Sequence, residues 1–120
     1  MRRILIADDD ETNQRLFKAI LEANGYETLQ AYDGAKCIEI AKEAQPDIIL
    51  MDIQMPKIDG TEAFKILQTE SLTRNIPVIA LTSYAMTDDR EKFLSNGFSD
   101  YIAKPISIDE LLVLVNFYCT

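Results

Sequence analysis

Carboxylates that directly follow short apolar segments are the first candidates for chemistry in this sequence. Asp8, Asp9 and Asp10 come after the β-rich segment RILIA, and Asp52 ends the apolar run IILMD. Carboxylates that meet without a partner repel each other, which raises a pKa or requires a cation. Because the chain has no histidine and an all-oxygen set favours hard ions, the pattern predicts a Mg²⁺ site in which Mn²⁺ can substitute.

Two later polar residues complement these carboxylates. The run IPVIALT ends in Thr82, and the segment SDYIAKP contains Lys104. A lysine ammonium suits a phosphoryl group as a point contact, and a threonine hydroxyl donates one further hydrogen bond. Together with the predicted metal site, they indicate phosphoryl transfer onto an aspartate, a form of covalent catalysis. Asp52 is the candidate acceptor, because a buried strand before it would hold it rigidly.

The elements that position these residues follow from hydrophobic periodicity. Apolar runs alternate with segments of helical spacing five times, which predicts an α/β domain with a doubly wound parallel sheet. The predicted strands are residues 3–7, 26–32, 46–52, 76–82 and 99–105, and the predicted helices are 12–25, 33–45, 61–70, 87–97 and 107–118. Ligands of such sheets bind beyond the carboxyl ends of the strands, where all the candidate residues would lie.

Turn and cap residues divide these elements. Asp33 and Thr87 are predicted N-caps, Gly25 and Gly97 are predicted helix ends, and Ser107 with Glu110 forms a capping-box pattern. The segment IQMPKIDG after Asp52 is expected to bend away as one wall of the site, with Asp59 and Gly60 as turn residues.

Size and charge restrict the class of protein. The chain has 120 residues, which predicts one domain over residues 1–120. Its net charge of −8 argues against direct nucleic-acid binding. No apolar run reaches the length of a membrane span, no signal peptide opens the chain, and the two cysteines lack metal-site spacing. We therefore expect a cytoplasmic protein with reduced thiols, without membrane contact.

Four motifs in order resemble a known family. The segments ILIADDD, LMDIQMPKIDG, ALTS and DYIAKPI are similar to the acidic pair, the phosphoacceptor segment, the switch hydroxyl and the switch aromatic with lysine of response-regulator receiver domains. The segments NGYETLQ and ALTSYAM further resemble single-domain receivers of the DivK type. The resemblance covers essentially the whole chain and implies a (βα)5 fold, flavodoxin-like and CheY-like, with strand order 2-1-3-4-5.

The resemblance also implies roles in phosphoryl transfer. Asp52 would accept the phosphoryl group from the phosphohistidine of a sensor histidine kinase or a histidine phosphotransferase, and Lys104 would pair with it. Asp9 would bind Mg²⁺ directly and Asp8 largely through water. Asp52 and the backbone carbonyl of Gln54 would complete the protein ligands.

Further residues would form the switch. Thr82 would turn to hydrogen-bond the phosphoryl group, and Tyr101 would move inward. The face of the fourth helix, fifth strand and fifth helix would then change its affinity for a downstream protein, in a monomer or weak dimer. The Lys104–Pro105 peptide would be cis.

The resemblance implies two further expectations, about the docking of the phosphodonor and about the lifetime of the phosphoryl group. The start of the first helix, around Asn13, Gln14 and Phe17, would be the side on which the phosphodonor docks. Side chains two positions beyond the acceptor and the threonine, Gln54 and Tyr84, would tune hydrolysis. A bulky Tyr84 predicts a long-lived phosphoryl group.

Other functions stay open at the level of sequence. A Mg²⁺-dependent phosphatase or phosphotransferase could use an aspartyl intermediate on small substrates. Such an enzyme usually has its nucleophile and acid on one strand end, as Asp-x-Asp, whereas the candidate acceptor here ends the third strand and nothing resembles a substrate lid. A binding module that no longer accepts phosphate conflicts with the complete set of acids, lysine and hydroxyl. A dinucleotide-binding domain is excluded, since no glycine-rich loop follows the first strand. We expect a signalling switch that catalyses only its own phosphorylation and slow dephosphorylation.

Overall fold

The computed structural model of the chain describes residues 2–55, 58–82, 92 and 94–119. Its strands are β1 (Arg3–Ala7), β2 (Glu27–Ala31), β3 (Ile48–Asp52), β4 (Val78–Thr82) and β5 (Asp100–Ala103). Its helices are α1 (Glu11–Ala23), α2 (Gly34–Ala44), α3 (Gly60–Thr69) and α5 (Ile108–Cys119). The predicted helix 87–97, with its cap Thr87, lies largely outside the described residues, although residues 92, 94 and 95 are helical.

The strands form one parallel sheet in the order β2-β1-β3-β4-β5. Both the alternation and the strand order are therefore as predicted. Every residue of β3 and β4 is buried, which explains why these strands read as continuous apolar runs. The parallel arrangement brings the carboxyl ends of all five strands to one edge of the sheet.

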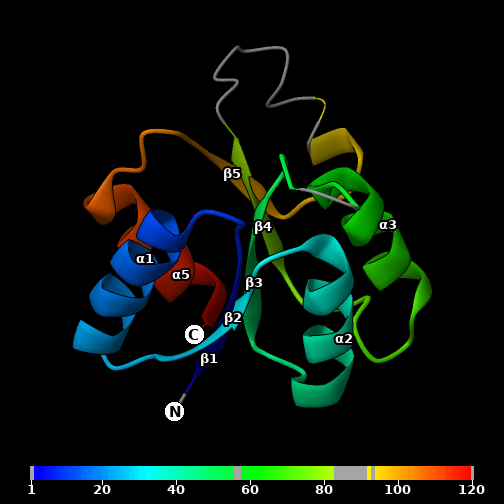
Figure 1. Cartoon of the computed structure of the whole chain (residues 1–120), viewed down its shortest axis with the longest axis horizontal. Coiled ribbons are helices and arrows are strands. Elements are labelled where there is room, and N and C mark those ends of the chain that lie inside the picture. Colours follow the sequence, from blue (N-terminus) through cyan, green and yellow to red (C-terminus); the bar gives the residue numbers. More distant parts are fainter. Residues whose placement is uncertain (1, 56–57, 83–91, 93, 120) are drawn as a thin grey trace.

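Helices cover both faces of this sheet, with α1 and α5 on one side and α2 and α3 on the other (Figure 1). Because side chains alternate along a strand, β1 supplies both cores. Leu5 and Ala7 pack toward the α2–α3 side, and Ile4 and Ile6 pack with the residues of α1 and α5. β1 is thus fixed from both faces at the point where the acidic segment begins.

Aspartates begin three of the helices. The side chains of Asp10, Asp33 and Asp59 accept hydrogen bonds from backbone N–H groups in the first turns of α1, α2 and α3. The cap at Asp33 was predicted, whereas Asp59 was predicted to be a turn residue and is instead the N-cap of α3. Gly25 has a φ of +89° just beyond α1, which confirms it as the residue at which this helix ends.

Gly60 is required for a reason other than turn geometry. A Cβ atom added at this position would lie 2.5 Å from the backbone oxygen of Asp52. The Gly60 N–H also donates to the Ile53 oxygen at 2.9 Å. The start of α3 therefore packs directly on the end of β3, which fixes the backbone beneath Asp52.

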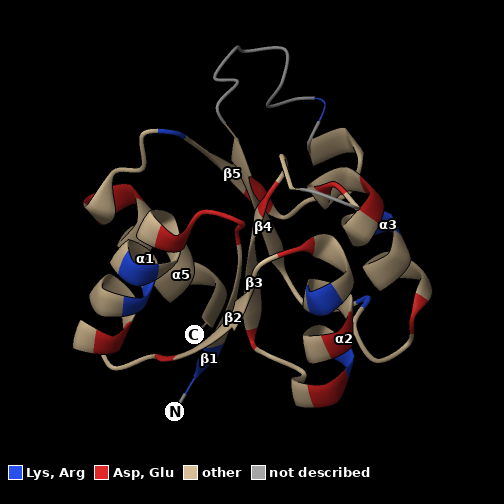
Figure 2. Cartoon of the chain, in the orientation of Figure 1, with Lys and Arg blue, Asp and Glu red and all other residues tan. Residues whose placement is uncertain are grey.

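Charged residues of both signs are mixed over α1, α2 and α3, whereas α5 carries only acidic ones, and acidic residues mark the segment that leaves β1 (Figure 2). Within the described part of the chain, no helix combines the length and the apolar character that a membrane crossing requires.

Candidate functional site

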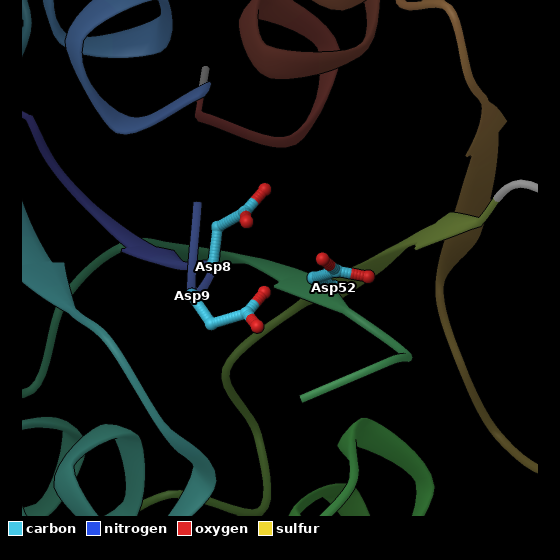
Figure 3. Close-up of side chains that lie close together, drawn as sticks. All are labelled: Asp8, Asp9 and Asp52. Carbon is cyan, nitrogen blue, oxygen red and sulfur yellow. The ribbon is translucent and has the colours of Figure 1, made fainter. Parts of the chain in front are cut away.

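Three carboxylates meet at the carboxyl edge of the sheet. Asp8 and Asp9 follow β1, Asp52 ends β3, and one oxygen of each lies within 4.8 Å of the others. Figure 3 shows the three side chains gathered beyond the two strand ends. This spacing fits a hard divalent cation with carboxylate ligands and additional waters. The predicted cluster is therefore present, and Asp10 is separate from it as the cap of α1.

Asp52 is held by two groups and is nearly inaccessible. Its side chain is 4% exposed. The Lys104 ammonium lies 3.0 Å from Asp52 Oδ2, and the Gln54 N–H donates to Asp52 Oδ1 at 3.0 Å. The structure thus brings Lys104 to Asp52 from a strand end two positions away in the sheet, as predicted.

Asp8 has no solvent exposure at all. Its Oδ1 accepts from the Asp10 N–H at 2.9 Å, and its Oδ2 accepts from the Asn13 amide at 3.2 Å. Lys104 Nζ is 3.9 Å from Asp8 Oδ2. Burial and, to a smaller extent, the neighbouring charge of Asp52 raise the pKa of Asp8 to about 6, against the opposing effect of the Asp10 N–H. A nearby cation would stabilise the ionised form of this buried carboxylate.

Asp9 differs from its neighbour, because it is exposed. Its carboxylate belongs to the same cluster (Figure 3). Of the three acids it is the one that solvent and a hydrated ion reach most easily.

Backbone pairing and a hydrogen bond link the ends of β4 and β5. Thr82 is 1% exposed and pairs with Ala103. The Lys104 N–H donates to the Thr82 oxygen at 2.7 Å. The Lys104–Pro105 peptide is cis, as the resemblance implied. The hydrogen bond from the Lys104 N–H to Thr82 ties Lys104 to the end of β4, next to β3, and from there its ammonium reaches Asp52.

Tyr101 lies in β5 and is partly buried against the core. It also lines a surface hollow of about 290 Å³ with five residues of β5 and α5: Asp100, Ala103, Glu110, Val113 and Leu114. The fourth helix, which the prediction placed beside it, is largely outside the described residues, as is Tyr84. Tyr101 therefore connects the interior to the β5–α5 surface.

The predicted docking residues on α1 need correction. Gln14 is completely buried and Phe17 is 1% exposed, so neither can contact a partner, and Asn13 is occupied with Asp8. The spacing of Gln14 from Phe17 and Leu21, three and seven positions, is that of a buried helix stripe, and this signal could have identified it. Leu16 is instead the large apolar residue that α1 exposes, at 46%.

Two contributions to the site were missed at the sequence level. Asn13 donates to Asp8, and β2, which carries no acidic or basic end, supplies the Ala31 carbonyl that accepts the Asp8 N–H at 3.0 Å. A backbone carbonyl leaves no mark in the sequence. The contact between Asn13 and Asp8 had a weak indication in the sequence, because Asn13 lies one helical turn beyond the acidic segment.

Comparisons with known proteins decide the family. Residues 4–116 match the response regulator receiver domain family. The chain belongs to that family. It is similar to the polar-differentiation response regulator DivK of Brucella anthropi, with 40% identity over 117 residues that cover 98% of this chain and 95% of the relative.

Solved structures agree. The receiver domain of a Francisella response regulator has a TM-score of 0.93 and 35% identity, and the match covers 99% of this chain and 97% of that chain. The receiver domain of a Pseudomonas aeruginosa sensor histidine kinase, described with a magnesium ion coordinated in its active-site cleft, has a TM-score of 0.90 and 34% identity over 98% and 97% of the two chains. This chain is thus a receiver domain of two-component signalling with a CheY-like fold.

Proposed function

We propose that Asp52 is the phosphoacceptor of this receiver and that residues 1–120 act as one receiver domain. An Asp52 oxygen attacks the phosphorus of a phosphohistidine on a sensor histidine kinase or histidine phosphotransferase. The phosphorus–nitrogen bond breaks, and the imidazole leaves and takes up a proton. The observation that carries this proposal is the buried Asp52 carboxylate with Lys104 at 3.0 Å and two further carboxylates within 4.8 Å.

The residues fit a bound Mg²⁺. Asp9 is the accessible ligand, Asp52 shares the cluster, and the backbone carbonyl of Gln54 is the proposed third protein ligand. Asp8, with both oxygens already accepting hydrogen bonds, suits contact through a metal-bound water. When bound, the ion would neutralise charge that develops on the phosphoryl oxygens. Mn²⁺ has similar ligand preferences and is the proposed substitute.

Lys104 and Thr82 would act on the phosphoryl group itself. The Lys104 ammonium now pairs with Asp52, and on phosphorylation it would pair with a phosphoryl oxygen instead. The Thr82 hydroxyl would donate a hydrogen bond to another oxygen, since its strand end lies beside that of β3. Tyr101 would follow the movement of Thr82 and change the β5–α5 surface, where Val113 and Phe117 are 66% and 71% exposed. A downstream protein would bind there.

The phosphodonor would dock on the exposed surface of α1, near Leu16 and Arg15, instead of on Gln14 or Phe17. Leu16 offers apolar area close to the acidic segment, and Arg15 is 80% exposed with only a surface ion pair to Glu11. A monomer or weak dimer suffices for this reaction, and the chain would act as a switch without turnover of small substrates, apart from its own phosphorylation and slow dephosphorylation.

The test is intact mass after incubation with acetyl phosphate, with and without Mg²⁺. We expect one phosphoryl adduct that requires Mg²⁺ and is absent from Asp52→Asn. Asp59→Asn is the matched control, because Asp59 caps α3 and lies outside the cluster, and it should keep the adduct. A folded wild-type protein that binds Mg²⁺ without forming the adduct, or an adduct that persists in Asp52→Asn, would overturn the proposal.

A further inference from the structure

Gln14 is a buried polar residue with an unusual set of contacts. Its side chain has no solvent exposure. The amide nitrogen lies 3.0 Å from the Ile6 oxygen, 3.0 Å from the Asp8 oxygen and 2.8 Å from the Ala31 oxygen. One side chain of α1 therefore contacts the backbone of β1, of β2 and of the acidic segment.

These carbonyls are at the part of the backbone that sets the direction of the acids. Asp8 donates its own N–H to the Ala31 oxygen at 3.0 Å, so that oxygen accepts from both Asp8 and Gln14. The Asp8 carbonyl is part of the peptide that leads into Asp9. Gln14 thus joins α1 to the backbone immediately on both sides of the Asp8 side chain.

The hydrogen bonds of the Gln14 amide are made by its nitrogen and not by its oxygen. A glutamine amide has two N–H donors, and here they are shared among three carbonyl oxygens. The Gln14 Oε1 atom is buried and has no hydrogen-bond partner in the described structure. Leaving a buried acceptor unpaired is unfavourable, so the residue is placed for its donors and not for its oxygen. A residue that served only to fill space would be apolar, as Phe17 and Leu21 are on the same stripe.

We propose that Gln14 is a positioning residue for the metal site. Its amide holds the turn from β1 to α1 in the form that directs the Asp8 and Asp9 carboxylates toward Asp52. Ligand orientation by a neighbouring hydrogen bond is a common requirement for metal affinity. The inference rests on the proposed Mg²⁺-dependent function, since it concerns the same ligands, and it adds the residue that orients them.

A purely structural role makes a different prediction. If Gln14 only stabilised the fold, a variant would lose stability while its folded fraction kept full metal affinity. If Gln14 positions the acids, the folded variant binds metal more weakly. Metal affinity measured well below the unfolding temperature separates the two roles.

The experiment titrates Mn²⁺ into the full chain and follows free Mn²⁺ by electron paramagnetic resonance. Gln14→Met keeps the size and apolar stem of the side chain but removes both donors. We expect about tenfold weaker Mn²⁺ binding, as for other lost partners of metal ligands. Thr73→Val is the matched control, because Thr73 is also fully buried and donates to a backbone carbonyl, that of Leu67 at 2.7 Å. It should lose stability and keep wild-type affinity.

A milder variant covers the case in which Gln14→Met does not fold. Gln14→Asn keeps the amide but is one methylene shorter, so that it cannot reach all three carbonyls, and we expect a smaller loss of affinity. Wild-type affinity in a folded Gln14 variant would overturn this inference alone. Absence of Mn²⁺ binding by the wild type itself would overturn the proposed function and this inference with it. Weaker binding in Gln14 variants only, with Thr73→Val unchanged, supports it.

Discussion

The ends of β1 and β3 carry buried aspartates that differ in how they are held. At the end of β3, Asp52 lies on a backbone packed against Gly60 and has Lys104 at 3.0 Å. At the end of β1, Asp8 lies 3.9 Å from the same lysine and is held by hydrogen bonds from the Asp10 N–H and the Asn13 amide. Burial is the main cause of the raised pKa of Asp8. The protein therefore places a cation beside Asp52, the proposed acceptor, and leaves the β1 side deficient in positive charge, which a metal ion would correct.

Lys104→Met should produce the largest effect, because it removes the cation that distinguishes the two sides. Without it, Asp52 has no cationic partner among the described residues, and the phosphoryl oxygens would lose a donor. We expect phosphorylation by acetyl phosphate to slow on the order of 10²–10³-fold, as for other groups that stabilise developing charge. The rate of adduct formation by mass spectrometry measures this. Lys36→Met, which removes only a surface ion pair, should leave the rate unchanged, and a Lys104→Met rate near wild type would contradict the assignment.

Asp8→Asn should remove the free-energy cost of keeping the buried Asp8 carboxylate ionised in the folded protein. The native pKa of Asp8 is about 6 against 3.8 for the ordinary group, so the native state binds this proton more tightly than the unfolded state. Protonation favours folding, and this stability is lost as pH rises from about 4 to about 6. Without metal above pH 6, the variant should be more stable by on the order of 3 kcal/mol, since the pKa difference is about 2 units and each unit is worth about 1.4 kcal/mol.

Urea unfolding of both proteins from pH 4 to pH 8 checks this expectation. The difference between them should increase up to about pH 6 and then stay constant. Added Mg²⁺ should stabilise the wild type more than the variant, because the variant lacks one acid of the cluster. A difference that is independent of pH would show that the Asp8 charge has no cost in the native state.

Gly60→Ala tests the backbone that holds the β3 side. The new Cβ would meet the Asp52 oxygen at 2.5 Å, and Gly34→Ala is a matched control because its Cβ would meet the Ile58 oxygen at 2.4 Å. Both should lose about 1–3 kcal/mol of stability, the usual cost of overpacking. Only Gly60→Ala should also slow phosphorylation of the folded protein. Equal phosphorylation rates in the two variants would mean that the Asp52 backbone tolerates the shift.

The same contrast explains what could be predicted from the sequence. Runs such as IILMD and VIALT predicted β3 and β4 because strands buried on both faces are continuously apolar. The strand-end position of Asp52 and Lys104 then followed from the parallel topology. The β1 side was less predictable, because it depends on contacts between a helix side chain and backbone carbonyls. Gln14 was placed on the docking side by the family resemblance, and a polar side chain gave no indication that it would be buried. The predicted helix 33–45 does end at Gln45, but the φ of +46° at this residue was not predicted, because glycine usually takes that place.

Asn13→Ala should have the smallest effect, because it removes one of the two hydrogen bonds to Asp8 and leaves the charges in place. The Asn13 amide lowers the pKa of Asp8, although less than the other causes that act on it. Its loss should raise that pKa slightly further and weaken Mn²⁺ binding at neutral pH by a few-fold, in line with about 1 kcal/mol for a hydrogen bond. Asn24→Ala, which loses a hydrogen bond to the Ile20 carbonyl at the far end of α1, is the control for stability. We expect Asn13→Ala to differ clearly from Gln14→Met in this assay. If the two variants weakened Mn²⁺ binding equally, metal affinity would depend on the Asn13–Asp8 hydrogen bond as strongly as on the turn from β1 to α1 that Gln14 holds.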